Sequence, residues 1–248
     1  MTVDTYLYPF GVTDARSRDE IPLWRESYRA NVACRNAIQS AISRHFDGMN
    51  LDDACLDEVI ADYGYKRTTF VLANTLKQKI DDGRFHRENI EWSRRIYVPP
   101  DREHNDSFAV DSHPAVLDGF IRLYRNRLDS LGLFQSEHCE PNARAELDYT
   151  DRVLVLSREV LSEDYWEPKY QLWYAHDGFG CSPHAIGRSI RATCLADGEL
   201  TRWNRSDFLG PIKDEFLPDW AREQAERLRE GQTLVDYEQE PAMQEMTV

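Results

Sequence analysis

The sequence predicts an α+β protein: a mostly helical N-terminal part, followed by a small mixed part with an antiparallel β-hairpin sheet and a C-terminal helix. Apolar residues recur at helical spacing through most of residues 24–131. Beyond residue 150 this spacing gives way to short apolar runs, and an Asp-Gly pair between two of them indicates a tight hairpin turn. We therefore expect a helical domain with an N-terminal arm at 1–134, a linker at 135–150, an α+β domain at 151–231 and a disordered acidic tail at 232–248.

The N-terminal arm, residues 2–18, is expected to be irregular because Pro9 and Gly11 interrupt its aromatic residues. We expect those aromatic side chains to be buried against the core. A long amphipathic helix is predicted over residues 24–46, where apolar side chains alternate with arginines at helical spacing.

Three shorter helices should follow. Asp52 can cap the first of them, and Gly64 can adopt the left-handed conformation that ends it. The second should begin at once and stop at the turn pair Asp82-Gly83. A short third helix is expected over residues 88–95.

A polar loop and a further helix complete the helical part. Residues 101–107 follow two prolines and are expected to form an exposed loop. Ser112 lies two residues before Pro114, which is the arrangement of an N-cap and a first-turn proline. The helix that they start should end at Gly132.

The mixed part is predicted from short apolar runs and one turn. The pair Asp197-Gly198 supplies the positive φ angles that a tight antiparallel hairpin needs. We expect strands at 153–156, 171–175, 189–195 and 200–203, one or two helical turns at 159–165, and an amphipathic helix from Pro218 to Gly231.

Composition narrows the class of protein. The chain has 30 basic and 44 acidic residues, a formal net charge of -14, and no apolar run long enough to span a membrane. The start MTVDTYLYPF lacks the basic and apolar regions of a signal peptide. We expect a folded cytoplasmic protein that does not bind membranes.

The cysteines and histidines offer one weak metal candidate. Five cysteines, an odd and widely spaced set, are expected to be reduced. Only Cys181-Ser182-Pro183-His184 has the spacing of a zinc knuckle. Small buried cysteines and polar surface histidines are the simpler interpretation, so no metal and no cofactor is expected. The weak zinc candidate comprises His176, Cys181, His184 and Cys194.

Signals for catalysis are few. Cys139 adjoins His138, and an imidazole can lower a thiol pKa, but sequence neighbours seldom face each other. His113 and, in the charged loop, His104 are equally open, and a capping or solvent-exposed role is the simpler interpretation for both. If the chain is an enzyme, we expect its catalytic residues in the loops around His113, Cys139 or Cys181. No phosphate-binding loop, HExxH, GxSxG or kinase signature occurs.

Two charged regions are candidate binding surfaces. The arginines around the hairpin could form a basic patch that contacts nucleic acid, an RNA-bearing complex or an acidic partner. Arginines on the solvent face of a hairpin are common, however, and that is the simpler interpretation. The acidic C-terminal end carries 10 acids and 3 bases from Asp214 to Glu245 and could imitate the phosphates of DNA. The basic candidates are Arg188, Arg191, Arg202, Trp203 and Arg205, and the acidic candidates are Asp214, Glu215, Asp219, Glu223, Glu226 and Glu230.

Several strings resemble those of one protein family. The most distinctive are GFGCSP-x-x-x-GR at 178–188 and the DGE turn at 197–199. Four longer stretches, at 24–46, 63–76, 112–124 and 177–205, are followed by LPDWARE and bring the similarity to most of the chain. They resemble an uncharacterised family encoded by conjugative and integrative elements of Firmicutes, including domains of large polyvalent mobile-element proteins.

The resemblance implies that the chain is encoded by a mobile genetic element. It implies no catalytic residue, because none is established for the family. Accessory proteins of mobile elements often blunt host defences such as restriction or CRISPR-Cas. Our first hypothesis is a non-enzymatic interaction protein that inhibits a host defence nuclease, such as a Cas effector or its RNA-bound complex, by protein contact or DNA mimicry. The alternative is a hydrolase or modifying enzyme that acts on a defence component or a nucleotide signal. Direct nucleic-acid binding by the hairpin arginines is a third and less favoured interpretation.

Overall fold

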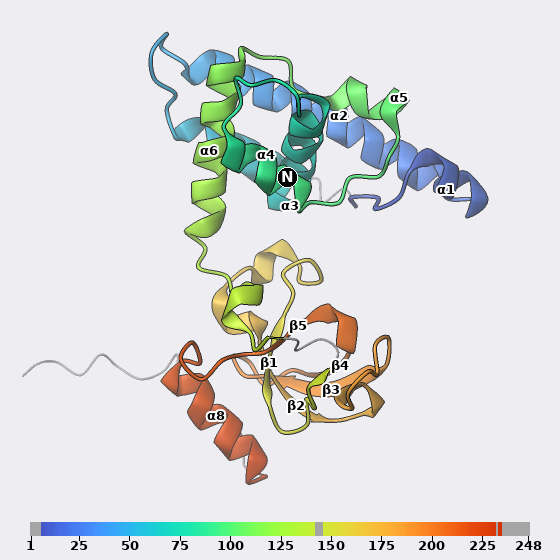
Figure 1. Cartoon of the computed structure of the whole chain (residues 1–248), viewed down its shortest axis with the longest axis vertical. Helices are drawn as coiled ribbons and strands as arrows, with labels where there is room; N and C mark the ends of the chain where they lie inside the picture. Colours follow the sequence, from blue (N-terminus) through green and yellow to red (C-terminus); the bar gives the residue numbers. More distant parts are fainter. Residues whose placement is uncertain (1–5, 142–145, 232, 235–248) are drawn as a thin grey trace, which may run out of the picture. The chain divides into compact units, whose positions relative to one another are not determined.

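The computed structural model describes residues 6–141, 146–231 and 233–234. Contacts divide the chain into two compact units, Met1–Ser130 and Leu131–Val248, which are drawn in Figure 1 and described separately. The boundary lies near the end of the expected helical domain at residue 134. The expected acidic tail lies outside the described residues, apart from 233–234.

The first unit is helical, as its apolar spacing predicts. Pro22 and Pro114 lie in the first turns of the two helices that they begin, where a missing backbone N–H is not needed. The helices are α1 (Val12–Ser17), α2 (Ile21–His45), α3 (Ala54–Gln78), α4 (Arg87–Arg94), α5 (Arg102–Asn105) and α6 (Pro114–Asp129), with a 3-10 turn η1 (Asp106–Phe108).

Gly64 interrupts α3. Its φ is 71° and its ψ is 173°, so the helix breaks there and restarts within the same element. The positive φ expected at Gly64 is present, with an extended ψ in place of the left-handed helical one, and the two helices predicted on either side of it are the two halves of α3.

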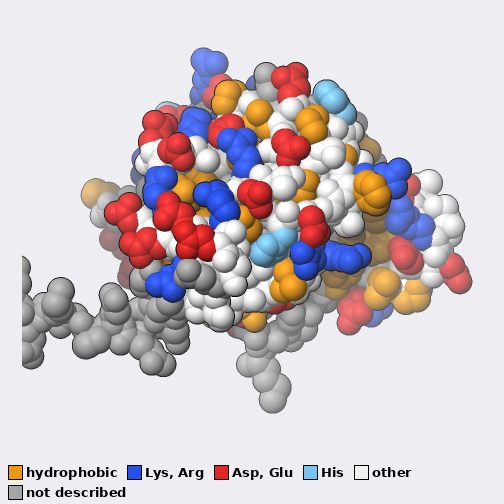
Figure 2. All heavy atoms as spheres, turned by 90° about the horizontal axis from the view of Figure 1, so that it is seen from below, with side chains coloured by type: hydrophobic (Ala, Val, Ile, Leu, Met, Phe, Trp, Pro, Cys, Tyr) orange, Lys and Arg blue, Asp and Glu red, His pale blue; other side chains and the backbone are white. Residues whose placement is uncertain are grey.

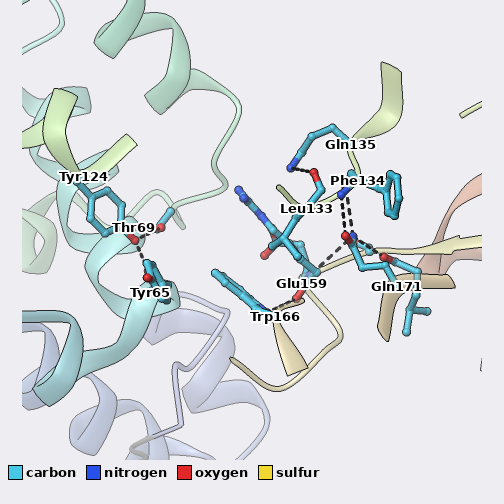
Figure 3. A network of polar contacts seen from close by, with 12 residues as sticks. Tyr65, Thr69, Tyr124, Leu133, Phe134, Gln135, Glu159, Trp166 and Gln171 are labelled. Atoms are coloured by element: carbon cyan, nitrogen blue, oxygen red, sulfur yellow. Dashed lines mark hydrogen bonds and ion pairs between the residues drawn. The ribbon is translucent and has the colours of Figure 1, made fainter. Parts of the chain in front are cut away.

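Side chains from α2, α3 and α6 form the core of the first unit. Ile38, Leu72 and Phe120 have no exposed surface. Burying such side chains stabilises the fold by roughly 1.5 to 3 kcal/mol each. Figure 3 shows how the buried Tyr124 hydroxyl donates to the Tyr65 carbonyl at 2.7 Å and lies 2.7 Å from the Thr69 hydroxyl. These bonds satisfy the polar end of an otherwise apolar side chain.

Three local expectations for this unit are wrong. The arm contains a helical turn, α1, and Tyr6 is 61% exposed although Tyr8 is buried. The expected loop at 101–107 instead forms α5 and η1, because Phe108 is buried and draws the segment onto the core. His113 rather than Ser112 occupies the N-cap position of α6.

The second unit contains a five-stranded antiparallel sheet in the order β4-β3-β2-β1-β5. The predicted strands and hairpin are confirmed, and β5 was not predicted. A segment with Gly210 and Pro211 carries little strand signal. The strands are β1 (Val153–Leu156), β2 (Leu172–Asp177), β3 (Ser189–Cys194), β4 (Leu200–Asn204) and β5 (Phe208–Pro211).

The C-terminal helix α8 (Asp219–Arg229) covers one part of the sheet (Figure 1). Ala221 and Ala225 are buried in one cluster with Val155, Leu172 and Tyr174. These small side chains let the backbone of the helix approach the sheet closely. The side of α8 opposite these alanines faces solvent. The second unit also has short 3-10 turns: η2 (Ser136–His138), η3 (Glu163–Tyr165), η4 (Pro168–Gln171), η5 (Phe179–Cys181) and η6 (Arg205–Asp207).

Part of the segment expected to be a linker is structured in this unit. Cys139 forms an isolated β-bridge with Ile212, and Tyr149 is fully buried. Just before this segment, the backbone N–H of Phe134 donates to the buried amide of Gln171 at 2.7 Å (Figure 3). The same amide donates to the Leu156 carbonyl at 3.0 Å, so Gln171 ties residue 134 to β1. No helix in the described ranges has the length and apolar character needed to cross a bilayer.

Candidate functional site

The predicted basic hairpin forms, but its arginines do not share one environment. Arg191 lies directly opposite Arg202 in the β3–β4 register. The Arg191 guanidinium is paired with Asp177 at 2.7 Å. The guanidinium groups of Arg188 and Arg202 are exposed and have no ion pair or hydrogen bond to any other described residue. Within the described part of the chain, two unpaired guanidinium groups therefore remain from the four arginines of the candidate patch.

Arg205 is not available to a partner, which corrects its place in the expected patch. It is only 1% exposed. Its guanidinium donates to four backbone carbonyls at 2.6 to 3.2 Å, those of Leu147, Gly180, Cys181 and Ser182. It also stacks 3.6 Å from the centroid of the Tyr149 ring. Arg205 thus holds the loop after β2 in place. Trp203, which precedes it in the hairpin, is partly buried and packs edge-to-face on Trp173 at 5.4 Å.

The loop held by Arg205 carries the GFGCSP-x-x-x-GR string. A Cβ at Gly178 would lie 2.5 Å from the Ser189 carbonyl oxygen, and one at Gly180 would lie 2.4 Å from that of Arg188. Only glycine allows this close approach of the loop to the start of β3. The loop exposes two large apolar side chains, with Phe179 at 85% and Ile186 at 66% exposure. The residues of this string therefore form a loop that packs closely against the start of β3 and exposes two apolar side chains.

The acidic candidates lie on the surface of the second unit. Asp219, Glu223, Glu226 and Glu230 follow at steps of four, three and four residues, which places them on one side of α8 and its C-cap. This is the side away from Ala221, which is buried against the sheet. All six acidic candidates are exposed: Asp214, Glu215, Asp219, Glu223, Glu226 and Glu230.

Basic residues accompany these acids. Arg222 lies 3.7 Å from the Asp214 carboxylate, and Arg227 and Arg229 are in the last turn of α8. On the face of the molecule seen in Figure 2, acidic side chains gather at one side with basic ones between them. The acidic surface is therefore a row of carboxylates flanked by arginines, with a lower net charge than the acids alone would give.

The four zinc candidates do not assemble. The His176 imidazole lies 2.7 Å from the Thr193 hydroxyl, and burial lowers its pKa. Cys181 and Cys194 are buried, and burial raises the pKa of both thiols, that of Cys194 to about 12. His184 is exposed in a loop with a φ of 59°. In the described part of the chain, no three His, Cys, Asp or Glu side chains converge on a point that could hold a metal ion.

The three catalytic candidates are divided between the two units. His113 is exposed at the start of α6 in the first unit. Cys139 and Cys181 belong to the second unit, and both are 3% exposed. The Cys139 thiol lies 3.8 Å from the Gln135 carbonyl, a backbone contact that suits a buried structural thiol.

Sequence reasoning missed an aromatic cluster in the first unit. The rings of Trp24 and Tyr28 stack at 5.2 Å, and His104 meets both edge-on. The His104 Nδ1 atom lies 2.8 Å from the Asp101 carboxylate. The spacing of Trp24 and Tyr28 on one helical turn was a signal, but residues 101–107 were expected to be an exposed loop. The adjoining cavity has a volume of about 30 Å³, close to the share of one water molecule in the liquid.

Comparison with known proteins adds one match. Residues 7–129 match the model of a family described as "protein of unknown function" (DUF3849). The matched segment covers the helices of the first unit, so the resemblance to an uncharacterised family is supported there. The hairpin and α8 lie beyond it. No match was found among curated proteins or among solved structures.

Proposed function

We propose that this chain is a non-enzymatic interaction protein of a mobile element that binds and inhibits a host defence nuclease, such as a CRISPR-Cas effector. The observation that carries the proposal is the row of exposed carboxylates on α8. The row is fixed in space because the opposite side of the helix is buried against the sheet. A fixed row of negative charge complements a channel that is lined with arginine and lysine to hold nucleic acid.

The length of the carboxylate row suits part of a nucleic-acid channel better than a site that holds a full duplex. Eleven residues separate Asp219 from Glu230, which corresponds to about 16 Å of helix. Neighbouring carboxylates are therefore about 5.5 Å apart along the axis, compared with about 3.4 Å between the phosphates of one DNA strand. The row imitates the sign and the linear arrangement of a phosphate strand at a lower charge density. It should compete for part of a nucleic-acid channel.

The helix dipole does not account for the row. Only Asp219 lies at the helix N-terminus, where a carboxylate interacts favourably with the helix dipole. Glu226 and Glu230 lie in the last turn and at the C-cap, where the dipole disfavours negative charge by roughly 0.3 to 1 kcal/mol each. A role in binding explains acids at these positions.

The resemblance supports the mobile-element setting, and the family match supports only membership of the first unit in an uncharacterised family. Both fit a protein that acts through its surface. The target would recognise α8 through its own arginines and lysines. Such an encounter should be fast at low salt and slower at high salt.

The test is capture from a host lysate that contains active defence systems, followed by a cleavage assay with each captured nuclease. A tagged neutral variant combines Asp219→Asn, Glu223→Gln, Glu226→Gln and Glu230→Gln. A matched control removes four exposed acids from the first unit through Asp62→Asn, Glu103→Gln, Asp111→Asn and Asp129→Asn. Both variants lose the same net charge, so they separate the position of the acids from the total charge.

We expect the wild-type chain and the matched control to capture a nuclease and slow its cleavage of target DNA, and the neutral variant to do neither. Equal capture by both variants would overturn the role of α8. A lysate that yields no nuclease would overturn the inhibitor proposal and favour the enzyme alternative. Thermal unfolding of both variants checks that the substitutions leave the fold intact.

A further inference from the structure

The outer edge of β4 pairs with no other strand of the described residues. β4 ends the sheet and pairs only with β3 among the described elements. Just outside the named strands, the Cys194 N–H donates to the Glu199 carbonyl, and the Arg205 N–H donates to the Arg188 carbonyl. Hydrogen-bonded pairs alternate along an antiparallel ladder, so Ile190–Trp203 and Ala192–Thr201 are the bonded pairs between them.

It follows that Leu200, Arg202 and Asn204 direct their backbone N–H and C=O groups away from β3. Asn204 is already used, because its N–H donates to the Asp207 carboxylate at 2.8 Å. Leu200 and Arg202 have no such contact with another described residue. The edge thus offers two donors and two acceptors at the spacing of an antiparallel or parallel strand.

The side chains along this edge differ between the two faces of the sheet. The Arg202 guanidinium is exposed on one face and unpaired among the described residues, whereas its cross-strand neighbour Arg191 is neutralised by Asp177. Trp203 is partly exposed on the other face and packs on Trp173. An added strand would therefore meet a positive charge on one face and an indole ring on the other.

We propose that the β4 edge binds an extended segment of a partner protein by strand addition, with an acidic residue beside Arg202 and an apolar residue beside Trp203. The backbone groups of Leu200 and Arg202 would supply the hydrogen bonds, and the alternation of side chains would supply specificity. The inference rests on the proposed function only in treating the chain as an interaction protein. It concerns a surface separate from the acidic row on α8.

A second copy of the chain is a poorer occupant of this edge. Antiparallel pairing of two β4 edges would place Arg202 opposite its counterpart or, after a shift of register, beside it on the diagonal. Like charges at these positions destabilise the pairing. The acids of the hairpin turn, Asp197 and Glu199, precede the first residue of β4. They do not pair with Arg202, so the centre of the strand remains positively charged.

The test uses the full chain and a labelled dodecapeptide in which glutamate alternates with valine and threonine. A matched peptide has lysine in place of each glutamate. Binding is measured by fluorescence anisotropy for the wild type, for Arg202→Gln and for the conservative Arg202→Lys. We expect the glutamate peptide to bind about tenfold more tightly than the lysine peptide, and this preference to fall to about twofold in R202Q and to persist in R202K.

Amide hydrogen exchange gives a second readout that needs no variant. In the free chain, the amides of Leu200 and Arg202 should exchange quickly while those of Thr201 and Trp203 are protected. The glutamate peptide should slow exchange at Leu200 and Arg202 by about tenfold or more. Equal binding of the two peptides, or unchanged exchange at these amides, would overturn the proposal. Protection already present in the free chain would also overturn it, because the edge would then be covered by the chain itself or by a second copy. Loss of nuclease capture alone would bear on α8 and leave this result unaffected.

Discussion

Arg202 and Arg205 lie three residues apart in the same hairpin but have opposite roles. Arg202 is exposed and unpaired among the described residues, whereas Arg205 is buried and donates to four carbonyls. The difference arises from the loop after β2, which brings its carbonyl groups to one of them. A buried guanidinium of this kind is strongly coupled to its acceptors, because removing it takes one hydrogen bond from each of four carbonyls at once, although those of Cys181 and Ser182 keep a backbone donor.

The first prediction concerns this coupling. Arg205→Met should lower the free energy of unfolding of the second unit by about 3 to 5 kcal/mol, because four carbonyls each lose a hydrogen bond and the ring of Tyr149 loses the guanidinium stacked on it. Arg202→Met, the matched exposed substitution, should change it by less than about 0.5 kcal/mol. Urea denaturation followed by tryptophan fluorescence measures both. Equal effects of the two substitutions would show that Arg205 does not hold the loop.

The second prediction uses the thiol of Cys194. Burial raises its pKa to about 12, above the ordinary value of 9.0 that it regains on unfolding. Between these two values the unfolded chain loses the proton while the folded chain keeps it. The stabilisation is therefore complete below about pH 9 and is lost as the pH rises toward 12, at about 1.4 kcal/mol per pH unit.

Denaturation series between pH 8 and pH 10.5 can test this dependence on wild type and Cys194→Ala. Other groups also titrate there, including Cys34 and Cys55, whose pKa values burial likewise raises to about 12. These contributions are the same in both proteins and cancel in the comparison. The wild type should lose stability more steeply by about 1.4 kcal/mol per pH unit above pH 9. Parallel curves would mean that Cys194 is not shielded from solvent.

At the scale of elements, local signals predict a helix or a hairpin well when the element is long or contains a demanding turn. The helical spacing predicted α2 and α6, and the Asp197-Gly198 turn predicted the β3–β4 hairpin. β5 escaped prediction because a strand of four residues takes its stability from pairing with β1, which is distant in sequence. The segment at 101–107 was polar enough to resemble a loop, and the burial of Phe108 decided otherwise.

The same contrast between local sequence signals and contacts of distant segments applies to the candidate surfaces. The exposed side of α8 could be predicted, because acids and small apolar residues alternate at helical spacing within one segment. The burial of Arg205 could not be predicted, since its acceptors lie at 147 and 180–182 and only the folded loop brings them together. The pairing of Arg191 with Asp177 depends on the β2–β3 register in the same way.

Two glycines in different elements give the third prediction. A Cβ at Gly180 would lie 2.4 Å from the Arg188 carbonyl oxygen and 2.7 Å from the Ile190 side chain, so Gly180→Ala should destabilise the second unit by about 1 to 3 kcal/mol. Gly119 lies within α6 with no atom within 4 Å of such a Cβ. Gly119→Ala should therefore stabilise the first unit by about 0.5 to 1 kcal/mol.

Because the two substitutions should change stability in opposite directions, measuring both gives a stringent test. Thermal unfolding should shift downward for Gly180→Ala and upward for Gly119→Ala. A stabilised Gly180→Ala protein would show that the loop does not lie against the start of β3.

At the scale of the whole molecule, charge is divided unevenly between the two units. Residues 131–248 contain 12 basic and 23 acidic residues, a formal charge of -11 out of the -14 of the chain. The free arginines of the hairpin belong to this same acidic unit. The field of this unit at a distance is therefore negative, and the positive charge of the hairpin arginines acts only close to the β4 edge. Such a distribution attracts basic partner surfaces and restricts acidic ones to short segments that fit locally.

The last prediction follows from this distribution and tests direct nucleic-acid binding. Of the hairpin arginines, Arg205 is buried and Arg191 is paired with Asp177, which leaves Arg188 and Arg202 to contact phosphates. Two contacts correspond to a slope of log affinity against log salt no steeper than about -2. Two contacts within a field of the wrong sign should give no measurable affinity for a short duplex or RNA at about 0.15 M salt.

Fluorescence anisotropy with a labelled duplex and a labelled single-stranded RNA, repeated over a range of salt concentrations, measures both quantities. The double variant Arg188→Gln/Arg202→Gln is the control, and any weak binding seen at low salt should disappear in it. Micromolar affinity with a slope of about -4 or steeper would require more phosphate contacts than the described hairpin can make. That outcome would place the binding site elsewhere on the chain and would contradict a function based on acidic contact with a nuclease. Absence of binding would agree with the two proposed surfaces, the carboxylate row of α8 and the β4 edge, because both are proposed to bind protein rather than nucleic acid.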